Sequence, residues 1–388
     1  MWSIVGLARL ENDGVIQLGR GRVISKKDLQ AFEGPYPVYS AAKTGEGKFG
    51  TYGRYDFDEE LITWSVDGGG RLFHRERHKF SITNVTGFLR ILDPQVLTYR
   101  FLYYALTHLH SNIRFDWVKK AHPSVLRKEY TSIPLPPLAE QKRIVERLDK
   151  AFAEIDKAQN ANAKSERQLM VVLENAVAKL LITPKSTSEL TELSEFLDET
   201  ITGPFGSSLH KSDYTDNGVA VINPQNILNG EISTSNCNFI SYEKAKDLSR
   251  YSLQVGDIVL GRRGEMGRCA VVDASEKKMI CGTGCMILRA KSGCSPYYLA
   301  ELIRSKYIRS VLEKNSIGMT MANLNQKILL NVKIPRDSYR NQIERVNTCR
   351  RLREFVDSAI TIRKNKANKL TDIRRSILKQ ELTPSEAV

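Results

Sequence analysis

Few residues of this 388-residue chain stand in a pattern that could carry out chemistry. A DNA amino-methyltransferase needs an Asn/Asp-Pro-Pro-aromatic motif, and the nearest match, Asn223-Pro224-Gln225-Asn226, lacks the second proline and the aromatic ring. A phosphate-binding loop needs a hydroxyl residue after Gly47-Lys48, where this chain has Phe49. The four cysteines from Cys269 to Cys294 lack the spacing of paired zinc ligands, and we expect buried thiols in strands. The sequence therefore predicts no catalytic residue, no metal site and no cofactor in this chain.

Several loops carry side chains that suit DNA instead. The stretch Ser65–Arg75 places three glycines beside arginine and histidine, and arginine can bind guanine O6 and N7 or hold a phosphate. Amides such as Gln225 can read adenine in the same bidentate way. Taken singly, each such residue is also consistent with an exposed loop or a turn, but as a set they favour one polyanionic partner. The predicted DNA-binding residues are Lys43, Arg71, His74, Arg75, Ser207, Ser208, Lys211, Gln225, Asn226, Arg262, Arg263, Thr320 and Asn323.

The composition supports a nucleic-acid partner. Lys and Arg number 58 and Asp and Glu 44, which gives a net charge of +14. Hydrophobic residues make up 41% of the chain, which is enough for packed cores. No apolar stretch approaches the roughly 18 residues of a membrane span, and the beginning of the chain has no signal-peptide pattern. The six cysteines are scattered rather than paired, which fits a reducing compartment. We therefore expect a cytoplasmic protein, and the lack of a long apolar stretch predicts no membrane association.

Two long helices must position these loops, because the chain contains an internal repeat. One copy begins at Ser132-Ile133-Pro134, and the other begins 201 residues further along the chain, at Lys333-Ile334-Pro335. Each copy continues for roughly 44 residues with no internal proline or glycine, and with apolar or small residues at alternating steps of four and three. A heptad pattern of this length is typical of a coiled coil. Two separate helices packed inside ordinary domains are the alternative.

The two apolar seams become polar at matching places, Asn162/Ser165 and Arg363/Lys366. Pairing the helices centre to centre puts these polar layers opposite each other, where they can fix the register. The order globule, helix, globule, helix favours an antiparallel pair. The predicted residues for inter-helix packing and partner docking are Gln141, Ile144, Leu148, Ile155, Leu169, Val172, Gln342, Leu352, Val356, Leu370, Ile373 and Ile377.

The remaining segments alternate short β-rich runs with glycine turns, and each ends in a short helix. Examples are the strand Leu61–Val66 and the helices Thr98 to His110 and Tyr297 to Glu313. The sequence therefore predicts an α+β fold, in which two mixed α/β domains are separated by two long antiparallel coiled-coil helices related by a pseudo-twofold repeat. The predicted boundaries are 1–132, 133–184, 185–333 and 334–388.

The opening of the first long helix resembles a known family. The segment Ile133-Pro134-Leu135-Pro136-Pro137-Leu138-Ala139-Glu140-Gln141 is similar to the Ile-Pro-x-Pro-Pro-x-x-Glu-Gln stretch of specificity (S) subunits of type I restriction–modification systems. The second copy keeps Ile334-Pro335 and Gln342 but has neither the Pro-Pro pair nor the Glu. The segments Val255–Leu260 and Arg263–Gly267 also resemble this family.

The resemblance implies a non-catalytic subunit whose two globules are target-recognition domains and whose long helices are the conserved central and C-terminal regions. Such a subunit reads a split, asymmetric site in double-stranded DNA. Two methyltransferase (M) subunits dock on it and bring S-adenosylmethionine, and restriction (R) subunits add ATP- and Mg-dependent chemistry. A coiled-coil scaffold that does not read DNA is one alternative, and an enzyme with a degenerate site, such as an orphan methyltransferase, is another.

Overall fold

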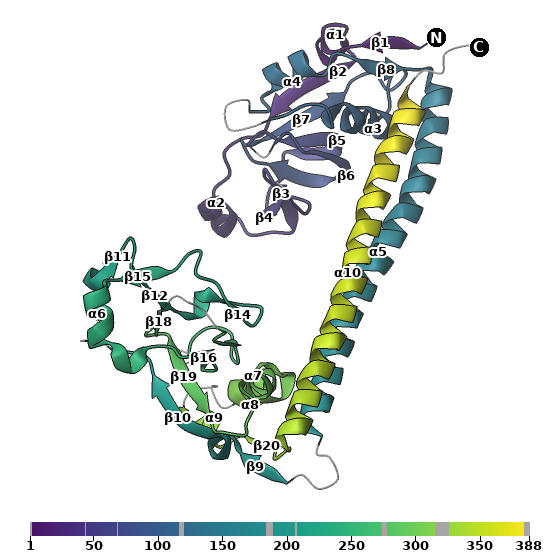
Figure 1. Cartoon of the computed structure of the whole chain (residues 1–388). Helices are drawn as coiled ribbons and strands as arrows, with labels where there is room; N and C mark the ends of the chain where they lie inside the picture. The colour runs from purple at the N-terminus through teal and green to yellow at the C-terminus, as the bar shows by residue number, and fades with distance from the viewer. Residues whose placement is uncertain are drawn as a thin grey trace. The chain divides into compact units, whose positions relative to one another are not determined.

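The computed structural model describes residues 2–42, 44–67, 69–115, 120–183, 189–205, 208–273, 278–314 and 326–383 (Figure 1). The chain forms two compact units, one of residues 1–162 with 364–388 and one of residues 163–363. Each unit contains one mixed α/β domain and one half of each of two long helices. The division between the two units falls in the middle of each long helix, so it does not test the predicted boundaries at residues 132, 184 and 333. These boundaries stay predictions.

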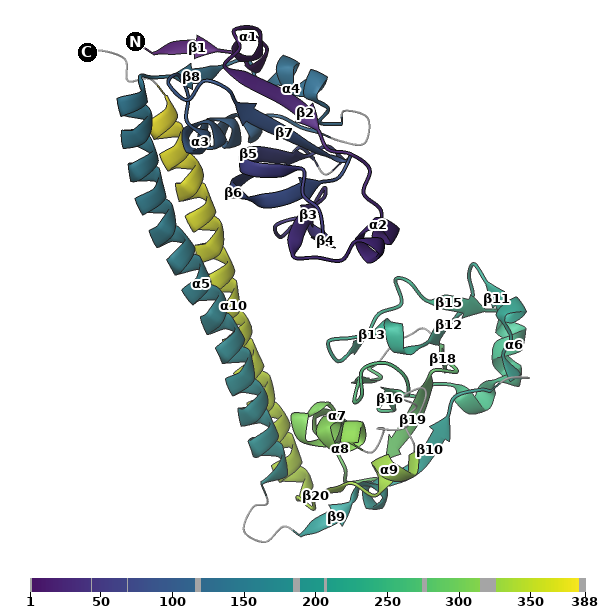
Figure 2. The same cartoon turned by 180° about the vertical axis from the view of Figure 1, so that it is seen from behind.

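The domain of the first unit is built on a six-stranded sheet (Figure 2). The strand order is β2-β7-β5-β6-β3-β4, and β3 runs parallel to β6 while the other neighbours are antiparallel. Trp64 is buried among apolar side chains of α3, and its indole N–H donates to the Ala121 carbonyl oxygen at 2.7 Å. The elements are β1 (Ser3–Val5), α1 (Leu7–Asn12), β2 (Ile16–Arg20), α2 (Lys26–Ala31), β3 (Tyr36–Tyr39), β4 (Lys48–Tyr52), β5 (Phe57–Ser65), β6 (Leu72–Ile82), β7 (Thr86–Ile91), α3 (Tyr99–His110), α4 (Pro123–Glu129) and β8 (Ile133–Leu135).

The domain of the second unit contains two four-stranded sheets, in the orders β10-β19-β16-β17 and β11-β15-β12-β18. Apolar strand residues such as Val259 and Ile287 fill the core between them, and α7 closes one side of the first sheet. The elements are β9 (Leu190–Glu192), β10 (Leu197–Thr202), β11 (Tyr214–Thr215), β12 (Val219–Ile222), β13 (Ile227–Leu228), β14 (Glu231–Ile232), β15 (Asn238–Ile240), α6 (Tyr242–Asp247), β16 (Ile258–Gly261), β17 (Cys269–Val271), β18 (Met279–Cys281), β19 (Cys285–Ala290), α7 (Pro296–Arg304), α8 (Lys306–Lys314), α9 (Gln326–Leu330) and β20 (Lys333–Pro335).

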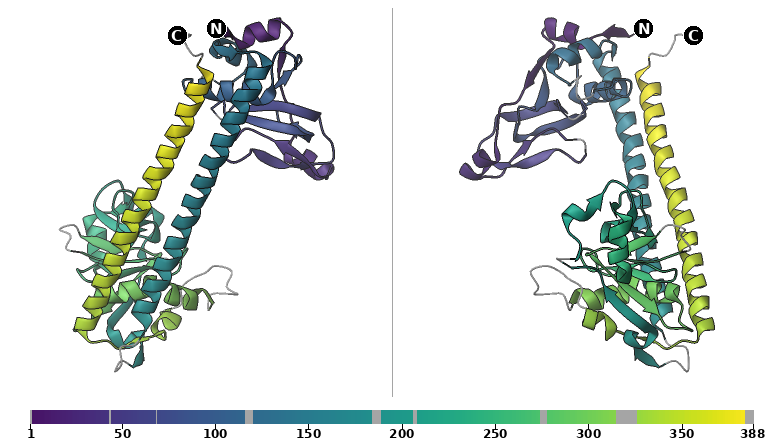
Figure 3. Two further views of the ribbon diagram at one scale, coloured as in Figure 1. Left: turned by 90° about the vertical axis from the view of Figure 1, so that its right-hand side faces the viewer. Right: turned by 60° about the vertical axis from the view of Figure 1, so that its left-hand side comes forward.

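The two long helices, α5 (Leu138–Ile182) and α10 (Tyr339–Leu382), lie side by side in antiparallel orientation within each unit (Figure 3). In the first unit, Arg147 pairs with Glu381, and Arg374 pairs with Asp156 at 2.5 Å. In the second unit, Arg363 donates to the Ser165 hydroxyl at 3.1 Å, so the predicted polar layers do meet. Residues later in α5 contact residues earlier in α10, which is the antiparallel arrangement. The predicted fold class, with two long antiparallel helices and an internal repeat, is confirmed.

The predicted seam is wrong at two positions. Val172 is 63% exposed and Ile373 is 48% exposed, and the buried side of α5 continues through Leu173, Val177 and Leu181 instead. The α-helix has 3.6 residues per turn, so a strict 3.5-residue repeat drifts around a nearly straight helix. A step of four residues in place of three after Leu169 moves the buried positions one residue along α5, which offsets the accumulated drift.

The glutamine in each repeat copy ties a long helix to its own domain. Gln141 is buried, accepts the Thr98 amide N–H at 3.0 Å and donates to the Val96 carbonyl oxygen at 2.9 Å. Gln342 is buried in the same way and accepts the Ser295 amide N–H at 2.7 Å. Thr98 and Ser295 are the N-cap residues of α3 and α7. Both glutamines therefore fix the beginning of a domain helix against the beginning of a long helix.

The two copies differ in one buried pair. In the second copy Asp337 and Arg345 form an ion pair at 2.6 Å, and both side chains are almost wholly buried. Arg345 also donates to the carbonyl oxygens of Leu180 and, at 2.8 Å, Thr183, which caps the last turn of α5. An offset of 201 residues places Pro136 and Ile144 at these positions in the first copy. An apolar pair at one junction thus corresponds to an ion pair at the other.

Within the described ranges, no helix is both long and apolar enough to cross a membrane.

Candidate nucleic-acid interface

In the first unit, the structure places the predicted residues Arg71, His74 and Arg75 at the beginning of β6. Arg75 is buried, and its guanidinium lies 3.7 Å from the ring centre of Tyr39. The two ring nitrogens of His74 contact Glu60 Oε1 at 2.6 Å and Arg100 Nη1 at 3.2 Å. These two side chains therefore hold neighbouring elements together, whereas Arg71 is only partly buried and stacks over Phe73 at 5.0 Å. Lys43, another predicted residue, lies outside the described residues, as does Gly68.

The contacts of Arg100 extend from this region to the long helix. Arg100 Nε donates to Asp149 Oδ1 at 3.0 Å, and the Tyr104 hydroxyl donates to the same oxygen. Burial and the hydrogen bond to this carboxylate both raise the pKa of Tyr104, so its hydroxyl keeps its proton. The domain helix α3 is thus bound to α5 through one carboxylate.

The first unit has a second basic surface, which was not predicted from the sequence. We call it the Arg54 cluster: Phe32, Arg54, Tyr55 and Lys79. Arg54 stacks over Phe32 at 3.8 Å and Lys79 over Tyr55 at 4.9 Å, and all four side chains are exposed. In the described part of the chain, neither cation has a carboxylate within ion-pair distance. Exposed rings with cations suit nucleic acid, and the local run Tyr52-Gly53-Arg54-Tyr55 was the signal that could have revealed it.

In the second unit, Arg262 is placed beside an exposed ring. Its guanidinium lies 5.1 Å from the ring centre of Phe205, which is 58% exposed. Burial, and secondarily the charge of Arg263, lower the pKa of Arg262. Arg263 and Lys211 are exposed, and Ser208 is partly buried. Ser207, Thr320 and Asn323 lie outside the described residues.

The two predicted amides have different surroundings. Asn226 is buried, and its Oδ1 accepts the Asn223 amide N–H at 3.0 Å, which closes a turn. Gln225 is exposed at the same turn. The geometry therefore leaves Gln225 available to a ligand, while the Asn226 side chain supports the backbone next to it.

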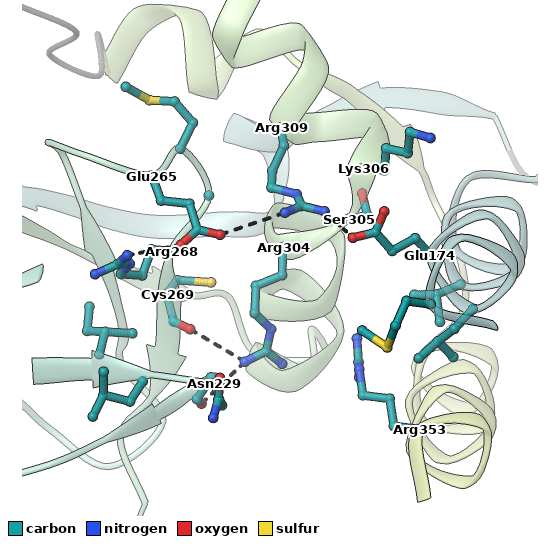
Figure 4. A pocket seen from close by; sticks show the side chains of 18 residues that line it. Glu174, Asn229, Glu265, Arg268, Cys269, Arg304, Ser305, Lys306, Arg309 and Arg353 are labelled. Carbon is teal, nitrogen blue, oxygen red and sulfur yellow. Dashed lines mark hydrogen bonds and ion pairs between the residues drawn. The ribbon is translucent and has the colours of Figure 1, made fainter. Parts of the chain in front are cut away.

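A cavity of about 350 Å³ lies where the second domain meets the long helices of its own unit (Figure 4). Arg304 projects from the end of α7 toward the Cys269 carbonyl oxygen, and Arg309 lies between Glu174 and Glu265. Glu301, which is buried, accepts Arg304 Nη2 at 2.7 Å and Arg353 Nη1 at 2.6 Å. Burial alone would raise the pKa of Glu301, but the two arginines hold it below its usual value. The members of this network come from distant segments of the chain, so no local sequence pattern predicts it.

The cysteines of the second domain are mostly buried thiols, as predicted. Cys269, Cys281 and Cys285 are buried in strands, whereas the prediction is wrong for Cys294, which lies between β19 and α7 and is partly exposed. Burial raises the pKa of Cys269 and of Cys285 to about 12, so both thiols stay protonated at neutral pH. Among the described residues there is no group of three or more His, Cys, Asp or Glu side chains arranged to hold a metal ion.

Comparison with known proteins relates the chain to one family. The family model described as "Type I restriction modification DNA specificity domain" matches residues 7–165 and 186–371. A putative type I specificity subunit of Mycoplasma pneumoniae is 35% identical over 136 residues, which cover 34% of this chain and 44% of the relative. The chain thus spans less than half the length of this relative, and 38% and 49% of two further subunits from the same organism. The specificity subunit of the type I restriction enzyme MjaVIII of Methanocaldococcus jannaschii is 24% identical over 83% of this chain and 78% of its own length.

Solved structures show the same fold. A chain from a structure of complex assembly and conformational transition of the type I R-M system aligns with a TM-score of 0.67 and 16% identity, covering 96% of this chain and 98% of that one. The HsdS subunit of Thermoanaerobacter tengcongensis aligns with a TM-score of 0.51 and 16% identity, over 99% and 97% of the two chains. Since the family model matches most of both halves of the sequence, the chain belongs to the family of type I restriction–modification DNA specificity subunits.

Proposed function

We propose that this chain is a DNA-recognition subunit that reads a split, asymmetric site, with one half-site for each domain. The observation that carries the proposal is the double match of the DNA specificity model, once in each half of the chain. Both halves share the Ile-Pro segment, the buried glutamine and the long helix, but their candidate DNA-binding side chains differ. Two unlike readers on one chain require two unlike half-sites.

We also propose that M subunits dock on the long helices, and that R subunits join the complex. Met170, Val171 and Val172 of α5 are large apolar residues exposed to solvent. On α10, Phe355 is 70% exposed and Ile362 is 68% exposed. Exposed apolar side chains on a rigid helix support a protein partner. The Val172 position, which was wrong for the helix seam, fits this docking surface.

The proposed subunit is non-catalytic and acts in the cytoplasm. S-adenosylmethionine, ATP and Mg²⁺ would be bound by the partner subunits, because this sequence lacks the methyltransferase and phosphate-loop motifs. The relatives named above are specificity subunits, which agrees with this division of labour.

The test is a map of methylated adenines in DNA by long-read sequencing, with the chain and its cognate M subunit expressed together or M alone. The expected result is one split motif with two unlike halves that appears only when this chain is present. A continuous motif, or methylation that does not depend on this chain, would refute the proposal. Co-purification with M but no DNA motif would favour the scaffold alternative.

Two variants separate docking from reading. Phe355→Ser should weaken co-purification with M, while Tyr242→Ser, which removes an exposed ring from α6 and not from a long helix, serves as the control. Inserting four residues after Asn162 should change the unread spacer and leave both halves of the motif as they are. A changed base in either half would contradict the separation of helices and readers.

A further inference from the structure

The segment Thr44–Lys48, which ends at the first residue of β4 in the first unit, is exposed except at Gly47 but has a defined conformation. Gly45 and Gly47 have left-handed φ values of 64° and 73°. The Ser40 amide donates to the Gly47 carbonyl oxygen at 2.8 Å, and a Cβ at residue 47 would lie 2.8 Å from the Ser40 carbonyl oxygen. The segment is therefore folded back on its own base, and residue 47 must be glycine.

Buried side chains of the sheet hold the main chain of this region. Ser65 is wholly buried; its hydroxyl accepts the Ala42 amide N–H at 2.9 Å and donates to the Ala42 carbonyl oxygen at 3.1 Å. Further along, Arg75 Nη2 donates to the Glu46 carbonyl oxygen at 2.6 Å. Arg75 Nε donates to Thr63 Oγ1 at 3.3 Å, which fixes the guanidinium to the neighbouring strand. The conformation of the segment is thus set by the sheet beneath it.

Burying the Arg75 guanidinium is unfavourable for the free energy of folding. It is 7% exposed, and burial lowers the pKa of its guanidinium despite the nearby Tyr39 and Glu46. The rings of Tyr39 and Phe73, with centres at 3.7 Å and 4.7 Å, stabilise the charge. In the described ranges, no carboxylate forms an ion pair with it. A buried charge without a carboxylate partner destabilises the fold, and here the shorter of its two hydrogen bonds goes to an exposed segment of main chain.

We propose that Thr44–Lys48 reads base edges in one half-site of double-stranded DNA, and that Arg75 is the positioning residue that sets its conformation. This inference rests on the function proposed above. The segment presents the Thr44 hydroxyl and the Lys48 ammonium to solvent, and these groups can bind base edges or phosphates in a DNA groove. A cavity of about 540 Å³, lined by residues 40–42 and 44–49, leaves room for a ligand beside the segment. A reading segment held on a rigid sheet loses little freedom on binding.

The test compares methylation maps made with the co-expressed M subunit for the wild type, Arg75→Lys, Lys48→Ala and Arg77→Lys. Arg75→Lys keeps the charge but cannot reproduce the planar contacts to Glu46 and Thr63. Arg77→Lys makes the same exchange on the same strand at an exposed side chain, and is the matched control. The wild-type map tests the proposed function by itself, so a failure of the inference can be recognised separately.

We expect Arg75→Lys and Lys48→Ala to relax the base preference in the same half of the motif. The preferred bases there should lose about tenfold in selectivity, while the other half and the Arg77→Lys map stay unchanged. An Arg75→Lys map identical to the wild type would overturn the proposal. It would also be overturned if both halves weakened together with the yield of the complex, because Arg75 would then serve only folding. If Lys48→Ala changed the other half, or neither half, the assignment of the reading segment would be wrong.

Discussion

The buried ion pair between Asp337 and Arg345 allows a quantitative prediction. Replacing Arg345 with Ile, the residue at this position in the first copy, leaves the Asp337 carboxylate buried without its counter-charge. It also removes the donors to the last carbonyl oxygens of α5. Breaking a buried pair from one side costs about 3–5 kcal/mol. Arg345→Ile should therefore lower the free energy of unfolding by about that amount.

Removing both charges should cost much less. In the double variant Asp337→Ala with Arg345→Ile, no buried charge remains at this junction. The Tyr298 hydroxyl, which lies 3.2 Å from Asp337 Oδ2, loses its acceptor, and the last carbonyl oxygens of α5 lose their donors as they do in the single variant. An unsatisfied hydroxyl costs about 1–3 kcal/mol, so the double variant should be more stable than the single one. Arg340→Ile, at an exposed position of the same helix, is the control and should stay within about 0.5 kcal/mol of the wild type.

The assay is urea unfolding at pH 7 with two probes. All three tryptophans, at positions 2, 64 and 117, belong to the first half of the sequence, so their fluorescence reports on the first unit. Far-UV circular dichroism reports on both units. Arg345→Ile should shift the dichroism midpoint more than the fluorescence midpoint. Equal stability of Arg345→Ile and Arg340→Ile would refute the reasoning, and so would a double variant that is no more stable than the single one.

Three further outcomes follow from other buried polar groups. Gln141→Leu and Gln342→Leu should each cost about 1–3 kcal/mol in urea unfolding, since each leaves the N-cap amide of a domain helix, part-buried at Thr98 and buried at Ser295, without its acceptor. Equal stability to the wild type would contradict this. The pKa of Glu301 is held below its usual 4.5, so its stabilising contribution is present above that pH and is lost as the pH falls through the lowered pKa. Glu301→Gln should therefore show a smaller loss of stability between pH 7 and pH 3 than the wild type, and parallel losses would argue against the network. At pH 8, iodoacetamide should alkylate the half-buried thiols of Cys237 and Cys294 well before those of Cys269 and Cys285, as measured by mass spectrometry. Equal rates in the folded protein would contradict the burial of Cys269 and Cys285.

Local patterns were enough for the elements and their repetition. The Ile-Pro segments, the breaker-free stretches and the polar interruption predicted two long antiparallel helices, because helix periodicity and heptad spacing are properties of consecutive residues. The strand Leu61–Val66 and the helix from Thr98 correspond to β5 and α3 for the same reason. The seam failed near Val172, since small departures from a strict heptad accumulate along a helix and only the partner helix shows which side is buried.

The sequence by itself determined the family, the internal repeat and the basic charge, because each of these properties depends only on local motifs or on composition. Which arginines are buried and which are exposed was decided only by the tertiary structure. Arg75 and Arg54 belong to the same residue type in the same domain, yet one is buried under a loop and the other lies open over a ring. The surroundings of each side chain come from strands far apart in the chain, and no local pattern records them. The pairing of Glu301 with Arg353, 52 residues later, arose in the same way, because only folding brings α7 against α10.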